Sequence, residues 1–206
     1  LPAPMKLPLI DRFGRTHTSL RVSVTDRCNL RCFYCMPEVG AEFQPRETLL
    51  TFEEIERVVN LLAERCGVRD VRVTGGEPLV RKDLPTLIKM LSEIRGIEDL
   101  SLTTNGILLD EFAQPLRRAG LKRLNISIDT LDEETFQRIA RRKGIDKVIR
   151  GIDAAIAAGF DQIKLNTTAV KGVTETEIVS LVQFAIERDV QIRFIEFMPL
   201  DTSRSW

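Results

Sequence analysis

Three cysteines, Cys28, Cys32 and Cys35, stand at the spacing C-x₃-C-x₂-C near the start of the chain. Three thiolates can hold three irons of a cubic [4Fe–4S] cluster, which normally takes four cysteines, so one iron is left open to a small molecule. A zinc site needs a further ligand, and the only histidine in the sequence, His17, stands eleven residues before Cys28. Unligated buried thiols are the third interpretation. The spacing favours the iron–sulfur cluster.

The fourth cysteine, Cys66, closes a helical pattern, and we expect it to pack as a small apolar side chain rather than to act as a fourth ligand. Clustered cysteines without a disulfide framework are typical of a reducing compartment, so we expect a cytoplasmic protein. No apolar run approaches the length of a membrane span, and residues 1–5 lack the features of a signal peptide. Thirty basic and thirty acidic residues cancel, which argues against a nucleic-acid or membrane partner.

Strands and helices that alternate along the chain must position the cysteines. The alternation predicts an α/β fold of parallel strands, with ligands at their C-terminal ends. With 206 residues we expect one domain over 1–206, made of an arm (1–15), a barrel or open sheet (16–199) and the start of a further segment (200–206). The expected strands are 20–24, 70–74, 100–104, 123–128, 162–168 and 191–196, and the expected helices are 51–65, 83–94, 108–119, 132–140, 145–158 and 175–188.

The turn Gly75-Gly76-Glu77-Pro78 follows the second expected strand. Glycines let backbone approach a ligand closely, and a carboxylate accepts a charged hydrogen bond from an ammonium group. The turn therefore predicts part of a ligand site, although a tight connection alone would use the same residues.

Four cations, Arg21, Arg72, Lys164 and Arg193, project from strands that are otherwise rich in apolar residues. Buried charges are costly unless they are paired, so converging cations indicate a polyanionic ligand. The alternative is that barrel carboxylates such as Glu196 or Asp129 pair with these cations.

The loop C-x₃-C-x-aromatic-C resembles the signature of the radical S-adenosylmethionine (SAM) superfamily. The segments Asp11–Arg15, Met36-Pro37 and Thr74–Leu79 resemble, more narrowly, the GTP 3′,8-cyclase family of molybdenum cofactor (molybdopterin) biosynthesis, and the similarity runs from about Leu9 to Pro199. The resemblance implies a partial (β/α)₆ TIM-like barrel of the radical SAM type. It also implies a lyase that converts GTP to 3′,8-cyclo-7,8-dihydro-GTP, with SAM and a [4Fe–4S] cluster as cofactors.

The resemblance assigns roles to individual positions. Some of these positions have an ordinary structural alternative: Tyr34 could pack the loop, Ser127 could be a small strand residue, and Met198 could fill the core. The resemblance implies Cys28, Cys32 and Cys35 as cluster ligands, Tyr34, Gly76, Glu77, Ser127 and Met198 as SAM contacts, Arg21, Arg72, Thr103 and Lys164 as GTP-binding residues, and Arg193 as a catalytic residue that assists the later reduction.

The same resemblance implies partners: the substrate GTP, an electron donor and a downstream enzyme that forms cyclic pyranopterin. It leaves a homodimer open. Members of the family carry a second [4Fe–4S] cluster in a later segment, and we expect its ligands to lie outside these 206 residues. Two rival functions stay open, namely a radical SAM enzyme acting on another substrate such as a peptide, and a non-catalytic module that binds zinc.

Overall fold

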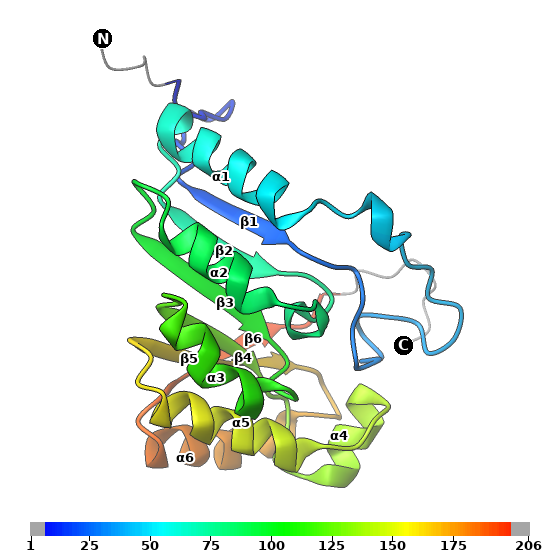
Figure 1. Cartoon of the computed structure of the whole chain (residues 1–206). Coiled ribbons are helices and arrows are strands. Elements are labelled where there is room, and N and C mark those ends of the chain that lie inside the picture. The colour runs from blue at the N-terminus through cyan, green and yellow to red at the C-terminus, as the bar shows by residue number, and fades with distance from the viewer. Residues whose placement is uncertain (1–6, 199–206) are drawn as a thin grey trace, which may run out of the picture.

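The computed structural model describes residues 7–198. Six parallel strands form one sheet in chain order, as the alternation predicts, and each predicted strand is confirmed to within one residue at either end. In Figure 1 the arrowheads point toward the loop that carries the cysteines. The strands are β1 (Ser19–Ser23), β2 (Asp70–Thr74), β3 (Asp99–Thr104), β4 (Arg123–Ser127), β5 (Gln162–Ala169) and β6 (Gln191–Glu196).

Helices connect successive strands and lie along one side of the sheet (Figure 1). The last helix begins three residues later than predicted, because residues 175–177 form a 3₁₀ turn in which the Glu177 N–H donates to the Thr174 carbonyl. The α-helices are α1 (Phe52–Cys66), α2 (Leu84–Ser92), α3 (Leu109–Arg118), α4 (Glu133–Ala140), α5 (Ile145–Ala157) and α6 (Ile178–Glu187), with 3₁₀ turns η1 (Arg46–Thr48), η2 (Pro78–Val80) and η3 (Glu175–Glu177).

The two faces of the sheet differ in polarity because side chains alternate along each strand. The face toward the helices is apolar and buried, as at Val73, Leu102 and Ile126. The opposite face carries the cations and amides of the candidate site. Within residues 7–198, β1 and β6 are edge strands that do not pair with each other, so the barrel is partial.

The connection from the cysteine loop ends at Thr51, the residue that caps the start of α1. Thr51 caps the helix: its hydroxyl accepts from the Glu54 N–H at 3.2 Å, and the Glu54 carboxylate accepts from the Thr51 N–H at 2.8 Å. These two reciprocal hydrogen bonds form a capping box. Gly67 ends the helix in the left-handed conformation with φ of 76°.

The part of the N-terminal arm that is described lies against the other end of α1, where the Leu7 N–H donates to the Arg65 carbonyl at 2.7 Å. The remainder of the arm, and residues 199–206, lie outside the described residues.

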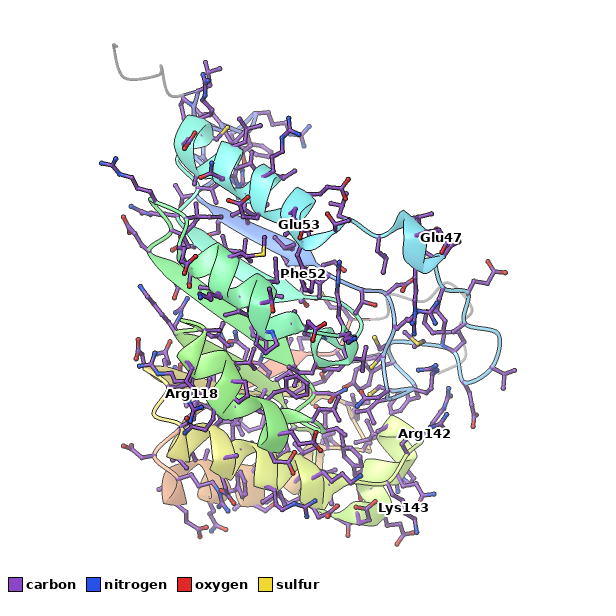
Figure 2. All side chains as sticks on the ribbon, in the orientation of Figure 1. Glu47, Phe52, Glu53, Arg118, Arg142 and Lys143 are labelled. Atoms are coloured by element: carbon purple, nitrogen blue, oxygen red, sulfur yellow. The ribbon has the colours of Figure 1, made fainter. Side chains whose placement is uncertain are left out.

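No helix in the described part of the chain is long and apolar enough to cross a membrane. On the turn between α4 and α5, Arg142 and Lys143 are exposed at the edge of the molecule (Figure 2).

Candidate active site

The cysteine loop leaves the C-terminal end of β1 and carries three free thiols. Cys28 and Cys32 are partly buried and Cys35 is exposed. Burial raises the pKa of all three thiols, that of Cys32 to about 12, and the neighbouring charges of Asp129, Cys28 and Cys35 add to the effect at Cys32. The thiols therefore lie close enough to interact electrostatically. As ligands they need a cation to displace their protons.

Within residues 7–198, no group of three or more His, Cys, Asp or Glu side chains is arranged to hold one metal ion. The assignment of Cys28, Cys32 and Cys35 as cluster ligands stays a prediction that rests on their spacing. The His17 ring faces Asp11 of the N-terminal arm, with 3.4 Å between His17 Nε2 and Asp11 Oδ2. Cys66 is the last residue of α1 and is partly buried, in line with a packing role.

The turn Gly75-Gly76 packs directly on the backbone of the cysteine loop. The Gly76 N–H donates to the Thr25 carbonyl at 2.7 Å, and the Glu77 N–H donates to the Arg27 carbonyl at 2.8 Å. A Cβ atom on Gly76 would lie 2.5 Å from the Arg27 carbonyl oxygen. The glycines thus allow two backbone segments to touch. The SAM contact expected of Gly76 stays a prediction.

Glu77 is 1% exposed, and its carboxylate accepts three hydrogen bonds. The donors are the Leu79 N–H at 3.0 Å, the Thr104 hydroxyl at 2.8 Å and the Asn105 N–H at 2.7 Å. Burial raises the pKa of Glu77, and these hydrogen bonds oppose the rise. Glu77 therefore joins the turn after β2 to the end of β3, a role that the sequence analysis missed. A carboxylate can accept about four hydrogen bonds, and three donors within the protein use all but one of these positions. A contact between Glu77 and a SAM ammonium group stays a prediction.

Tyr34 ties the loop to the ends of β4 and β5. Its hydroxyl donates to Asp129 Oδ2 at 2.5 Å, and Asp129 Oδ1 accepts from the Thr168 N–H at 2.7 Å. Burial raises the pKa of Asp129, while the hydrogen bonds from Tyr34 and Thr168 lower it. Asp129 thus serves the loop and does not pair with the strand cations, contrary to the alternative considered above.

We expect Tyr34→Phe to lower the free energy of unfolding by about 1–3 kcal/mol, because it leaves a buried carboxylate oxygen without its donor. Urea denaturation of the cluster-free chain measures this. Asp129→Asn keeps an acceptor for the hydroxyl, and the double variant then gives the coupling between the two side chains. An unchanged unfolding midpoint in Tyr34→Phe would contradict the assignment.

A cavity of about 630 Å³ opens beside the loop, at the ends of β5 and β6. Tyr34, Cys35 and Met198, which come from distant parts of the sequence, line it together with Thr168 and Ile195. Met198 is 62% exposed, so it does not fill the core. The structure thus brings together two of the predicted SAM contacts and one predicted cluster ligand.

The predicted GTP-binding residues lie on the polar face of the sheet, in rows set by the strand register. Arg21 is level with Arg72, and Thr103 is level with Asn125 and Lys164 one row nearer the cysteine loop. Ser127 and Arg193 lie in the next row, on either side of Asn166. Three row spacings of two residues each separate Arg72 from the level of Thr168, which is about 20 Å.

These cations have few partners in the protein. Among the described residues, no carboxylate lies within salt-bridge distance of Arg21, Arg72 or Lys164, and Arg72 Nε is buried without a hydrogen bond. Loss of hydration lowers the pKa of Arg72 and of Lys164, and neighbouring cations, Arg193 among them, lower both further. Pairing with Glu196 is likewise not seen in this part of the chain. The carboxylate of Asp99, which pairs with Arg123, opposes this lowering of the two pKa values only in part, so the inner face keeps an excess of positive charge.

Arg193 is held by two amides: it donates to Asn125 Oδ1 at 2.7 Å and to Asn166 Oδ1 at 3.0 Å. Arg123 forms an ion pair with Asp99 and shares a cavity of about 440 Å³ with Arg21 and Arg72 at the N-terminal ends of the strands. Asn125, Asn166 and Arg123 are not among the site residues predicted from the sequence. Their position on inward-facing steps of predicted strands is the signal that could have found them.

Comparison with known proteins gives one family match. The model of the radical SAM superfamily matches residues 22–185. A GTP 3′,8-cyclase of Rhodopirellula baltica is 66% identical over 97% of this chain and 56% of its own length, and one of Paenarthrobacter nicotinovorans is 46% identical over the whole chain and 58% of its own length. The chain thus spans a little over half the length of these relatives.

Solved structures support the same fold. Streptococcus suis SuiB bound to S-adenosylmethionine superimposes with a TM-score of 0.70 over 90% of this chain and 40% of that one, at 19% identity. The protein anSMEcpe with bound AdoMet gives 0.70 over 91% of this chain and 52% of that one, also at 19% identity. At this identity the likeness shows the fold, which confirms the predicted partial barrel of the radical SAM type.

Proposed function

Because this chain belongs to the radical SAM superfamily, we propose that Cys28, Cys32 and Cys35 hold a [4Fe–4S] cluster and that SAM binds at its open iron. When bound, the cluster and SAM supply a 5′-deoxyadenosyl radical that abstracts a hydrogen from the substrate. The cavity beside Cys35 supports this proposal, because it can receive a ligand next to the loop and is lined by Tyr34 and Met198. In the same proposal, Gly76, Glu77 and Ser127 contact SAM.

We further propose that the chain is the radical SAM part of a GTP 3′,8-cyclase, which converts GTP to 3′,8-cyclo-7,8-dihydro-GTP for molybdenum cofactor biosynthesis. The excess of positive charge on the inner face carries this proposal, since a triphosphate suits guanidinium forks and an ammonium group. Relatives named GTP 3′,8-cyclase agree with it. A peptide substrate, the rival proposal, gives no reason for so much unpaired positive charge.

The rows of the sheet suggest how GTP is oriented. Arg21 and Arg72, near the N-terminal ends of the strands, and Lys164, one row higher, bind the triphosphate. Thr103 binds GTP from the row of Lys164. Arg193 lies nearer the cysteine loop, where two amides hold its guanidinium, and in this proposal it assists the later reduction. In this orientation the ribose would lie on the side of the cavity that is proposed to bind SAM.

The test is hydrogen abstraction itself. The chain is reconstituted anaerobically with iron and sulfide, and given reductant, SAM and GTP deuterated at C3′. We expect deuterium in the 5′-deoxyadenosine detected by mass spectrometry. Unlabelled 5′-deoxyadenosine would contradict the GTP assignment for this chain, and no product with iron bound would contradict the SAM assignment.

Lys164→Ala provides the matched variant. Removing this ammonium is expected to cut deuterium transfer at least ten-fold at limiting GTP, since a charge-assisted contact is worth about 1.5–3 kcal/mol. SAM cleavage without GTP is expected to be unchanged. Lys147→Ala, on the exposed side of α5, is the control. Equal transfer by both variants would remove Lys164 from the substrate site.

The wider setting is part of the same proposal. An electron donor reduces the cluster, and a downstream enzyme that forms cyclic pyranopterin consumes the product. Free thiols that bind iron suit the reducing cytoplasm. We also propose that residues 16–199 act as one barrel domain, and that a second cluster, where present, is bound by a segment outside this sequence. The oligomeric state, including a homodimer, is open to measurement by light scattering.

A further inference from the structure

We propose that Asn105 is a positioning residue for the cluster ligand Cys28, and that the hydrogen bond from its carboxamide to the Cys28 sulfur raises the reduction potential of the cluster. This inference rests on the proposed function, since it takes Cys28 to be a ligand. Asn105 directly follows β3 and is not among the site residues predicted from the sequence.

The carboxamide of Asn105 is oriented by its neighbours. Its Oδ1 accepts from the Ile107 N–H at 3.1 Å, so its NH₂ group must point the opposite way. There Nδ2 lies 2.7 Å from Asn29 Oδ1 and 3.8 Å from Cys28 Sγ. An amide has two donor hydrogens, and the two acceptors use both of them.

The backbone of Asn105 is held as firmly as its side chain. Its N–H donates to Glu77 Oε2 at 2.7 Å, and the other oxygen of that buried carboxylate accepts from the Thr104 hydroxyl at 2.8 Å. Glu77 in turn belongs to the turn that packs on the cysteine loop. The donor group is therefore fixed relative to the loop that carries Cys28.

Cys28 also accepts from the Leu30 N–H at 3.4 Å, so two N–H groups point at this sulfur. Donors around a ligating sulfur stabilise its negative charge, and they do so more in the reduced state, which carries one more electron. Removing the Asn105 donor must make the cluster harder to reduce. The electron that the proposed reaction requires then enters less readily.

Two substitutions remove the donor and differ in what they leave. Asn105→Leu has a similar volume without polar atoms, and Asn105→Asp keeps an acceptor for Ile107 but turns a second oxygen toward Cys28. Thr104→Val is the matched control, because it removes the neighbouring hydroxyl, which donates to Glu77 and accepts from the Gly106 N–H, and this hydroxyl makes no hydrogen bond to the sulfur. The midpoint potential of the reconstituted cluster is measured by a redox titration followed by electron paramagnetic resonance, without SAM or GTP.

We expect both Asn105 variants to shift the midpoint to more negative potential, Asn105→Asp further than Asn105→Leu, and Thr104→Val to keep the wild-type value. We also expect the Asn105 variants to lose iron to a chelator about 10-fold faster than Thr104→Val, the order of a lost outer partner of a metal ligand. The rate remains measurable if a variant holds its cluster too weakly for titration. Unchanged potentials and rates, or equal shifts in Thr104→Val, would overturn the inference. A wild-type chain that binds no cluster would instead overturn the proposed function.

Discussion

Cys28→Ala is expected to abolish 5′-deoxyadenosine formation and to leave the chain without a stable [4Fe–4S] cluster. The loop offers three thiols, so the variant leaves two, and a second iron loses its protein ligand. Cys28 is also the thiol that receives hydrogen bonds from the Leu30 N–H and the Asn105 carboxamide. The measurements are iron and sulfide per chain, absorbance near 400 nm, and product formation from SAM under reductant.

Cys66→Ala is the control for the loss of a thiol as such. Cys66 is partly buried at the last residue of α1 and is not part of the loop, so this variant is expected to bind iron and cleave SAM as the wild type does. Replacing one small side chain by another costs little stability at a partly buried position. Full product formation by Cys28→Ala, or equal loss in both variants, would contradict the cluster assignment.

The strands could be predicted closely because their two faces differ so strongly. In β4, for example, the apolar Leu124 and Ile126 alternate with the polar Arg123, Asn125 and Ser127. This alternation with a period of two is visible in the sequence whichever strand is the neighbour. The start of α6 was less predictable. Its first turn is 3₁₀ if the backbone N–H donates to the carbonyl three residues earlier, and α if it donates to the carbonyl four residues earlier. The sequence pattern is the same for both.

The residues of the site that carry unusual chemistry could be found from the sequence, and those that hold them in place could not. Cysteines at a fixed spacing and cations in apolar strands are visible because few other roles suit them. Asn105 and Asp129 look like ordinary turn and loop residues in the sequence. The fold brings them into contact with Cys28 and Tyr34, which lie 77 and 95 positions away along the chain. Such contacts depend on strand register and loop path, which local patterns do not encode.

Two buried carboxylates, one on each side, hold the cysteine loop. Glu77 does so through the turn after β2 and the end of β3, and Asp129 does so through Tyr34 and the end of β5. Both carboxylates accept hydrogen bonds from neutral donors, so neither of them forms an ion pair with the cations of the inner face. This separation leaves the cations of the inner face free for a polyanion.

Gly76→Ala is expected to be among the most damaging single changes outside the cysteines. The new Cβ would lie 2.5 Å from the Arg27 carbonyl oxygen and 2.6 Å from that of Asp26, and backbone atoms cannot rotate away as a side chain can. The loop must shift, and the hydrogen bonds from Gly76 to Thr25 and from Glu77 to Arg27 weaken. Overpacking and two weakened bonds together lower the free energy of unfolding by about 2–5 kcal/mol. Urea denaturation of the cluster-free chain and iron content after reconstitution measure the two consequences.

Gly67→Ala separates the effect of contact from that of backbone strain. Gly67 has φ of 76°, which disfavours alanine, but its Cβ would meet nothing within 4 Å. Its cost is therefore strain alone, about 1–2 kcal/mol, and its iron content should match the wild type. Gly76 has the opposite combination, because its φ lies outside the left-handed region and its contacts are severe. If Gly76→Ala bound iron as well as Gly67→Ala does, the turn would not position the cysteine loop, and the glycine would have to be explained by contact with SAM alone.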